Sequence, residues 1–205
     1  MAVAAAANGK HIFCEKPVAR TLSETIEVVR VVEASGVPVH IGFQRRFDAG
    51  YRRARAQVAS GDLGFVHTVR AITGDRRPPP PAYIATSGGI FRDCAVHDAD
   101  IIRFVTGREV SRVVATGGTK GESYFPEGGD VDTAAALLTL DDGTLGLMST
   151  TRYHGQGHDV RLEVLPGVGH MAVQEAPTDL ARMQSLKEPG PCLKSCASSS
   201  RSRNS

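Results

Sequence analysis

The sequence predicts two unlike parts: the end of an α/β, doubly wound parallel sheet, followed by an α+β domain with a large, mostly antiparallel sheet. Two observations support this division. Near the N-terminus, residues 11–43 have the pattern of strand, helix and strand, which is one βαβ unit with parallel strands. Farther along, short apolar runs alternate with tight turns, which is typical of strands that pair antiparallel.

The helix of the βαβ unit has clear predicted ends. Thr21 and Glu24 form a capping box, in which each side chain can bond the other residue's backbone amide. Gly36 can end the helix because glycine adopts the left-handed conformation without strain. Strands are expected over residues 11–14 and 37–43, and the helix should bury a broad apolar face formed by Ile26, Val28, Val29, Val31 and Val32.

A second domain is expected to begin after Arg45 and Arg46, where the pattern changes. It should contain a helix, a strand, a Pro-rich turn and a second helix, over residues 51–59, 65–73, 78–81 and 93–105. Strands are then expected over residues 110–116, 134–140, 144–150 and 160–165. Asp141, Asp142 and Gly143 predict a hairpin turn between two of these strands.

The composition indicates a soluble globular protein, since 41% of the 205 residues are hydrophobic and 22% are charged. A formal net charge of +2 is too small to suggest a nucleic-acid partner. The apolar start is too short for a membrane span or a signal peptide, so no membrane partner and a cytoplasmic location are expected. No C-x-x-C spacing indicates a zinc site or a disulfide framework among Cys14, Cys94, Cys192 and Cys196.

Four motifs carry a resemblance to a known family. They are Gly9-Lys-His-Ile-Phe-Cys-Glu-Lys-Pro17, Ile41-Gly-Phe-Gln-Arg-Arg-Phe-Asp48, Ser87-Gly-Gly-Ile-Phe-Arg-Asp-Cys-Ala-Val-His-Asp98 with Asp100, and Gly129-Asp-Val-Asp-Thr133. Together they resemble the Gfo/Idh/MocA family of NAD(P)-dependent sugar and polyol oxidoreductases, and most closely its inositol 2-dehydrogenases. The resemblance covers residues 2–165 in unbroken order, is truncated at the N-terminus and diverges at the C-terminus.

The resemblance implies a division into domains and a set of partners. Residues 1–43 would be the remnant of an NAD(P)-binding Rossmann domain, and residues 44–176 a substrate and oligomerisation domain. Residues 177–205 are expected to be a disordered tail, since their final stretch is mostly Ser, Arg and Asn. The cofactor would be NAD or NADP, the substrate a small polyol or sugar, and the antiparallel sheet would pair subunits into a homo-oligomer.

The resemblance also places Lys16 at the junction of cofactor and substrate, with Asp93 and His97 acting on the alcohol and its proton. General chemistry agrees, because oxidation of a secondary alcohol needs a base that works near neutral pH, and imidazole suits this task. Asp93 and His97 are four residues apart and share one helix face. An ammonium group such as that of Lys16 stabilises a developing alkoxide.

Cofactor contacts are expected from Glu15, Lys16 and Pro17 of the first motif and from Gln44 of the second. However, the glycine-rich turn with which a Rossmann domain holds the pyrophosphate has no usable counterpart in the sequence. Residues 167–172 fit G-x-G-x-x-A by letters, but no βαβ unit surrounds them, so a turn at the sheet edge is expected there.

Other polar residues leave two interpretations open. Arg45 resembles a residue that lines the substrate pocket, yet it could pair with Asp48 instead. Asp100 could support the site or pair with Arg103. Asp75 is explained by a turn before a proline run.

The glycines between His154 and His158 favour a loop over a helix with two metal ligands, and no metal site is expected. The main hypothesis is therefore a polyol dehydrogenase, with a catalytically inactive fragment that acts as an oligomerising or sugar-binding module as the alternative. A fragment with no function of its own is a third possibility.

Overall fold

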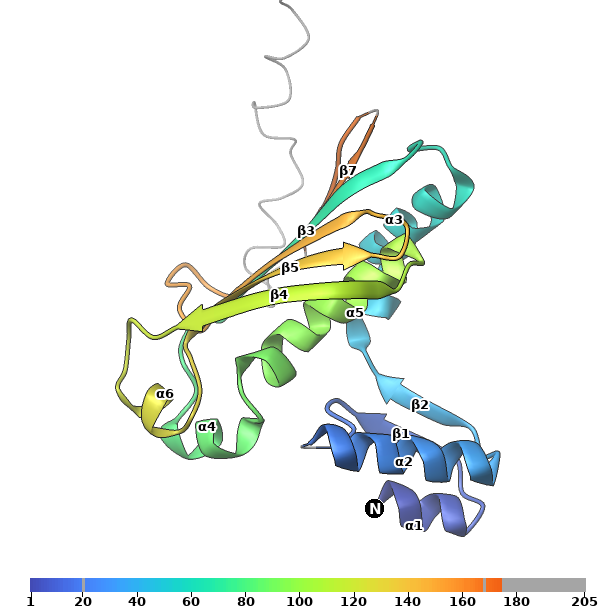
Figure 1. The fold of residues 1–205 in the computed structure, drawn as a ribbon, viewed down its shortest axis with the longest axis vertical. Helices are drawn as coiled ribbons and strands as arrows, with labels where there is room; N and C mark the ends of the chain where they lie inside the picture. The colour runs from blue at the N-terminus through green and yellow to red at the C-terminus, as the bar shows by residue number, and fades with distance from the viewer. Residues whose placement is uncertain (20, 168, 175–205) are drawn as a thin grey trace, which may run out of the picture. The chain divides into compact units, whose positions relative to one another are not determined.

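The computed structural model describes residues 1–19, 21–167 and 169–174, and the predicted disordered tail lies outside these residues. Its elements, shown in Figure 1, follow in this order: α1 (Ala2–Ala7), β1 (Ile12–Glu15), α2 (Leu22–Ser35), β2 (Val39–Gly42), η1 (Gln44–Phe47), α3 (Ala49–Ser60), β3 (Val66–Gly74), α4 (Pro81–Ser87), η2 (Phe91–Ala95), α5 (Val96–Thr106), β4 (Val110–Gly118), α6 (Tyr124–Glu127), β5 (Thr133–Leu140), β6 (Leu145–Thr151), β7 (Asp159–Pro166) and β8 (Met171–Gln174).

The N-terminal region forms the predicted βαβ unit. Strands β1 and β2 pair in parallel, and α2 makes the connection between them. The capping box is formed: Thr21 Oγ1 accepts a hydrogen bond from the Glu24 amide, and the Glu24 carboxylate accepts one from the Thr21 amide. Gly36 ends α2 at φ 65°, in the left-handed conformation that its position requires.

The prediction of a broad buried face on α2 was wrong. No residue of α2 is buried, and Ile26 and Val29 are 58% and 43% exposed. The physical reason is a shortage of partner surface, since the described sheet beside α2 has only two strands of four residues each. The apolar face of α2 is therefore not covered by other described elements.

The second region contains a six-stranded sheet in the order β4-β5-β6-β3-β7-β8. Every neighbouring pair is antiparallel except β3 and β6, which run parallel, so the predicted mostly antiparallel sheet is confirmed. Strands β5 and β6 form the predicted hairpin, in which the Leu140 amide bonds the Thr144 carbonyl at 2.9 Å and Gly143 has φ 87°.

The core lies between this sheet and the helices α3 and α5. One side chain in two along β5, β6 and β7 points toward the helices, as the two-residue period of a strand requires. The buried cluster consists of Tyr51, Ala54, Val69, Ala71, Ala95, Ile101, Ile102, Val105, Leu138, Leu140, Met148, Leu162 and Val164. This single layer of helices leaves the opposite face of the sheet uncovered among the described residues.

Three local features differ from expectation. The Pro-rich turn leads directly into helix α4, with Pro81 in the first turn, where its missing amide costs nothing. The helix expected over residues 93–105 begins with a π-helical turn, η2, before α5. Strand β8 was not predicted, and it pairs antiparallel with β7. Gly167 lies directly after β7, but Met171 and Ala172, which were expected in a sheet-edge turn, belong to β8.

Within the described residues, no helix combines the length and the apolar character needed to span a membrane.

Candidate active site

Polar side chains from several elements line a cavity of about 330 Å³ in the described part of the chain. The predicted residues Lys16, Asp93 and His97 all line it, although Lys16 follows β1 while the other two lie on η2 and α5. The remaining lining residues are Gln44, Arg45, Thr73, Asp75, Tyr83, Cys94, Arg152 and His158. The structure therefore brings the three predicted catalytic residues together.

The parallel pairing of β3 and β6 explains part of this convergence. Gly74 pairs with Thr151, so the next residues, Asp75 and Arg152, leave the sheet at the same edge. A hydrogen bond of 2.9 Å from the Asp75 amide to the Thr151 carbonyl holds the two strand ends together. Opposite them, η2 presents Asp93, and π-helical turns of this kind occur frequently at functional sites.

The motif over residues 129–133 supports the site from outside. Asp130 Oδ1 accepts a hydrogen bond of 2.9 Å from the Ile90 amide, at the start of η2. Asp132 is fully buried and accepts the amides of Lys120 and Gly121 at 2.9 and 2.7 Å. These carboxylates hold loop backbone in place and do not line the cavity.

Lys16 is mostly buried, with 19% of its side chain exposed. Its ammonium donates to the backbone carbonyl of Asp93 and to Asp93 Oδ1, the latter at 3.2 Å. The same charge also faces His97, since Lys16 contributes to the lowered pKa of that imidazole. Lys16 therefore joins the N-terminal region to Asp93 on η2.

The Asp93 carboxylate accepts hydrogen bonds from Lys16, from Tyr83 at 2.8 Å and from Arg152 at 2.9 Å, and the Cys94 thiol makes a longer contact with it at 4.0 Å. Burial raises the pKa of Asp93, but the hydrogen bonds from Tyr83 and Arg152 and the nearby positive charges outweigh it, and the net pKa is lowered. Asp93 is therefore an anion at neutral pH. Burial and the Asp93 carboxylate raise the pKa of Tyr83 to about 12, so Tyr83 remains a donor.

His97 is largely buried and packs edge-on against Phe43, with ring centroids 6.2 Å apart. Burial, together with the charges of Lys16 and Arg45, lowers the pKa of His97 to about 4. Its Nδ1 atom is buried and has no hydrogen-bond partner among the described residues. His97 is thus a neutral imidazole near neutral pH, and it has the capacity to accept a proton.

Arg45 does line the cavity, but the suggested pairing with Asp48 is wrong. Its guanidinium is 5% exposed and donates to Asp98 Oδ1 at 2.6 Å and to Thr73 Oγ1 at 3.1 Å. Asp48 instead caps α3 through the Gly50 amide at 2.7 Å. Arg45 is therefore held by Asp98, a fully buried carboxylate.

Asp100 does not reach the cavity. Its carboxylate accepts two hydrogen bonds from Arg46, one of them at 2.9 Å, while Arg103 pairs with Glu109. Asp100 therefore neither lines the cavity nor pairs with Arg103, the two interpretations that the sequence left open. It pairs with Arg46 instead. The reason is the preceding 3-10 turn η1, which brings Arg46 onto the face of α5 that carries Asp100.

The predicted cofactor residues lie at the carboxyl ends of the two parallel strands. Lys16 and Gln44 line the cavity, whereas Glu15 and Pro17 are exposed beside it, and the Lys16–Pro17 peptide bond is cis. A Cβ atom at position 42 would lie 2.7 Å from Glu15 Oε2, so a larger residue there would displace the exposed end of the Glu15 side chain. Contact of these residues with a cofactor stays a prediction.

Several lining residues were missed by sequence reasoning. Tyr83 and Arg152 carried no motif, and Asp75 had been explained as a turn residue. Their positions directly after β3 and β6 were the available signal for Asp75 and Arg152, once those strands were known to be parallel. His154 and His158 lie in the predicted loop, and within the described residues no group of three or more possible ligands could hold a metal ion.

Comparisons with known proteins match both regions. The GFO/IDH/MocA C-terminal domain matches residues 51–167, and the oxidoreductase family with an NAD-binding Rossmann fold matches residues 1–43. A myo-inositol dehydrogenase of Streptomyces leeuwenhoekii is 41% identical over 163 residues, which are 80% of this chain and 50% of that protein.

Solved structures agree with these matches. A putative myo-inositol dehydrogenase from Sinorhizobium meliloti aligns with a TM-score of 0.82 and 32% identity over 87% of this chain and 54% of that one. The scyllo-inositol dehydrogenase from Lactobacillus casei with bound NAD(H) and scyllo-inositol aligns with a TM-score of 0.73 and 30% identity, over 85% of this chain and 53% of that one. The chain spans about half the length of the curated relatives it matches.

Proposed function

Because the chain belongs to the Gfo/Idh/MocA family of oxidoreductases, we propose that it serves the NAD-dependent oxidation of a secondary alcohol on an inositol-like polyol. The observation that carries this proposal is the convergence of Lys16, Asp93 and His97 on one cavity. In the same proposal, residues 1–43 belong to the dinucleotide side and residues 44–176 to the substrate side. The names of the relatives, which are myo-inositol and scyllo-inositol dehydrogenases, support the choice of polyol.

The residues present fit the nicotinamide end of NAD. In open α/β sheets, ligands bind outside the carboxyl ends of parallel strands, and here Lys16 and Gln44 follow β1 and β2 and line the cavity. NAD, when bound there, supplies the acceptor for the hydride. No glycine-rich turn joins a parallel strand to a helix within residues 1–19 and 21–43, so the proposal assigns no pyrophosphate contact.

The side chains of the cavity divide the work on the alcohol. His97 is neutral and accepts the hydroxyl proton, and Lys16 stabilises the negative charge that develops on the oxygen. A carboxylate has about four acceptor positions, of which Lys16, Tyr83 and Arg152 fill three, and only the Cys94 thiol, a weak donor at 4.0 Å, lies near the fourth. The remaining position can accept a substrate hydroxyl, which would orient the ring of the polyol.

Calorimetry and absorbance at the reduced-nicotinamide band test this function on the full chain. NAD and then myo-inositol or scyllo-inositol would be titrated, and turnover is expected with at least one of them. His97→Ala should reduce turnover by about a hundredfold or more, whereas His67→Ala, on β3 outside the cavity, should leave it unchanged. Undiminished turnover in the His97 variant would contradict the proposed role.

A polyol-binding module without catalysis is the second candidate. It is favoured by the fact that the described residues line a polar cavity while no phosphate-binding glycine turn joins a parallel strand to a helix among them. Binding of an inositol without any binding of NAD would support this candidate over the dehydrogenase. Binding of neither would contradict both.

We further propose that a second copy of the chain covers the outer face of the antiparallel sheet. Val114, Leu137 and Leu147 are cross-strand partners on β4, β5 and β6, and they are 54%, 45% and 40% exposed. Apolar rows of this kind favour association when a matching surface exists. Sedimentation velocity should show a dimer or larger assembly that Leu137→Arg dissociates, while Leu22→Arg on α2 should not.

A further inference from the structure

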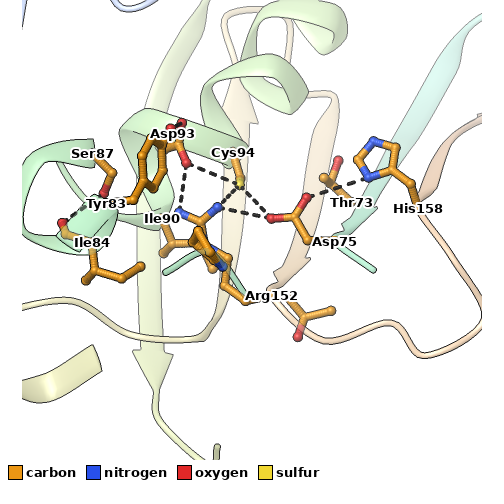
Figure 2. Close-up of polar contacts among 12 residues, drawn as sticks. Thr73, Asp75, Tyr83, Ile84, Ser87, Ile90, Asp93, Cys94, Arg152 and His158 are labelled. Atoms are coloured by element: carbon orange, nitrogen blue, oxygen red, sulfur yellow. Dashed lines mark hydrogen bonds and ion pairs between the residues drawn. The ribbon is translucent and has the colours of Figure 1, made fainter. Parts of the chain in front are cut away.

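Arg152 occupies the centre of the cavity wall but has no part in the proton chemistry described above. It follows β6, and its side chain is 3% exposed. As Figure 2 shows, the guanidinium lies between two carboxylates. It donates to Asp93 Oδ2 at 2.9 Å, to Asp75 Oδ2 at 3.0 Å and to Cys94 Sγ at 2.7 Å.

We propose that Arg152 is a positioning residue, which fixes the orientation and the negative charge of Asp93 so that Asp93 can receive the polyol. The proposal rests on the proposed function, because it assigns Asp93 the substrate hydroxyl. Arg152 itself acts through Asp93 and needs no contact with substrate.

The geometry of the guanidinium supports this role. Its planar fork donates from one nitrogen to Asp93 and from the other to Asp75, which ties η2 to the end of β3. A lysine ammonium is a point charge on a flexible stem and does not hold two carboxylates in a fixed plane. Burial of the arginine adds to the effect, because charge-assisted hydrogen bonds are stronger where water is excluded.

Arg152 is one of the two cations that pair with the buried negative charge of Asp93, and Lys16 is the other. The titratable and charged groups that line the cavity around Asp93 come from every neighbouring element: Lys16 after β1, Arg45 on η1, Asp75 after β3, Tyr83 on α4, Cys94 on η2, His97 on α5, Arg152 after β6 and His158 before β7. The Arg45 guanidinium is paired with Asp98. Burial raises the pKa of the Cys94 thiol to about 12, and Tyr83 has the same pKa, so both are neutral. Positive charge near Asp93 therefore comes chiefly from Lys16 and Arg152.

Removal of Arg152 should therefore change the titration of Asp93. Without the guanidinium, Asp93 loses one hydrogen bond and one positive charge, while the like charge of Asp75 remains nearby. Burial then acts with less opposition, and the pKa of Asp93 should rise. A residue with a merely structural role would lower stability without moving this midpoint.

The test follows the ¹³Cγ signal of Asp93 by NMR in the full chain, assigned with Asp93→Asn, together with scyllo-inositol binding by calorimetry across the same pH range. Arg152→Gln should raise the midpoint and weaken scyllo-inositol binding about tenfold at neutral pH. Arg152→Lys should restore part of the midpoint but less of the binding. Arg103→Gln is the matched control, since Arg103 pairs with Glu109 outside the cavity.

A second variant protects the test against misfolding of Arg152→Gln. Asp75→Asn keeps the guanidinium but removes its competing carboxylate, so the pKa of Asp93 should fall, in the opposite direction. An unchanged midpoint in a folded Arg152→Gln chain, or a raised midpoint in Asp75→Asn, would overturn the proposal. If the native chain binds no inositol, the proposed function fails, whereas the NMR midpoints still decide whether Arg152 controls Asp93.

Discussion

The regions before and after residue 43 differ in how much partner surface each helix finds. Within residues 1–19 and 21–43, only Ala6 and Gly42 are buried, although α2 has a well-formed capping box and a left-handed glycine at its end. In the second region, α3 and α5 share one continuous buried cluster with the six-stranded sheet. Local signals are therefore enough to define a helix, but burial decides which helix contributes to cooperative stability.

The largest expected effect concerns the border between the two regions. Arg45 follows β2 by three residues, yet it is anchored to fully buried Asp98 in α5. Asp98→Asn would remove the buried carboxylate from its ion pair with Arg45, and loss of one partner from a buried pair lowers the free energy of unfolding by about 3–5 kcal/mol. Urea denaturation measures this, and Glu109→Gln, in an exposed pair with Arg103, should leave the midpoint unchanged.

A loss of free energy of unfolding well below this value in Asp98→Asn would contradict the assignment of η1 to the second region. It would mean that η1 belongs energetically with the first region, and the division proposed after residue 43 would have to move.

The same substitution, Ile to Ala, at one position in each region compares how strongly each region depends on burial. Ile102→Ala removes a fully buried side chain from the core, and should lower the free energy of unfolding by about 3 kcal/mol through lost burial and a residual cavity. Ile26→Ala on α2 removes a side chain that is 58% exposed, and should change it by less than about 0.5 kcal/mol. Comparable losses in both variants, in the same urea experiment, would show that α2 has a core partner.

The pH dependence of stability should come from the second region through His97. The pKa of His97 is about 4 in the folded chain, whereas its ordinary value is 6.5. Between pH 6.5 and pH 4, the unfolded chain therefore binds a proton on His97 that the folded chain does not bind. The free energy of unfolding should therefore fall as the pH drops from 6.5 to 4, by about 2 kcal/mol after allowance for partial exposure.

His97→Gln should flatten this part of the stability curve, measured by urea denaturation at several pH values. His40→Gln removes an imidazole from the first region, where it stacks on Phe13, and serves as the control. A curve for His97→Gln that still falls as steeply as that of the native chain would assign the linkage to other groups.

The contrast between local and distant signals also decides what could be predicted from the sequence. The capping box, the βαβ unit and the hairpin at Asp141–Gly143 depend on neighbouring residues, and all of them are present. The insertion of β3 between β6 and β7 depends on pairing between distant segments, which no local pattern encodes. Helix α2 was misjudged because amphipathic spacing shows that a face is apolar without showing that anything covers it.

The site divides in the same way. Lys16, Asp93 and His97 were found because they belong to motifs, and the structure places all three on one cavity. Arg152 and Tyr83 were not found, because their importance depends on a contact with Asp93 across long stretches of chain. Asp100 was placed wrongly because Arg46, which binds it, lies 54 residues earlier in the chain.

The smallest expected effect is the most direct test of whether local structure and global stability are separate in the first region. Thr21 and Asp48 are both N-caps, on α2 and α3, and each accepts hydrogen bonds from amides of the first helical turn. Loss of such a cap costs about 1 kcal/mol.

Asp48→Ala should therefore lower the free energy of global unfolding by about that amount, because α3 is part of the buried cluster. Thr21→Ala should leave global unfolding unchanged and instead accelerate hydrogen exchange within α2 about fivefold, since α2 opens without the core. Equal shifts of the urea midpoint in both variants would show that the two regions unfold as one unit, and that α2 is held by contacts beyond its own capping box.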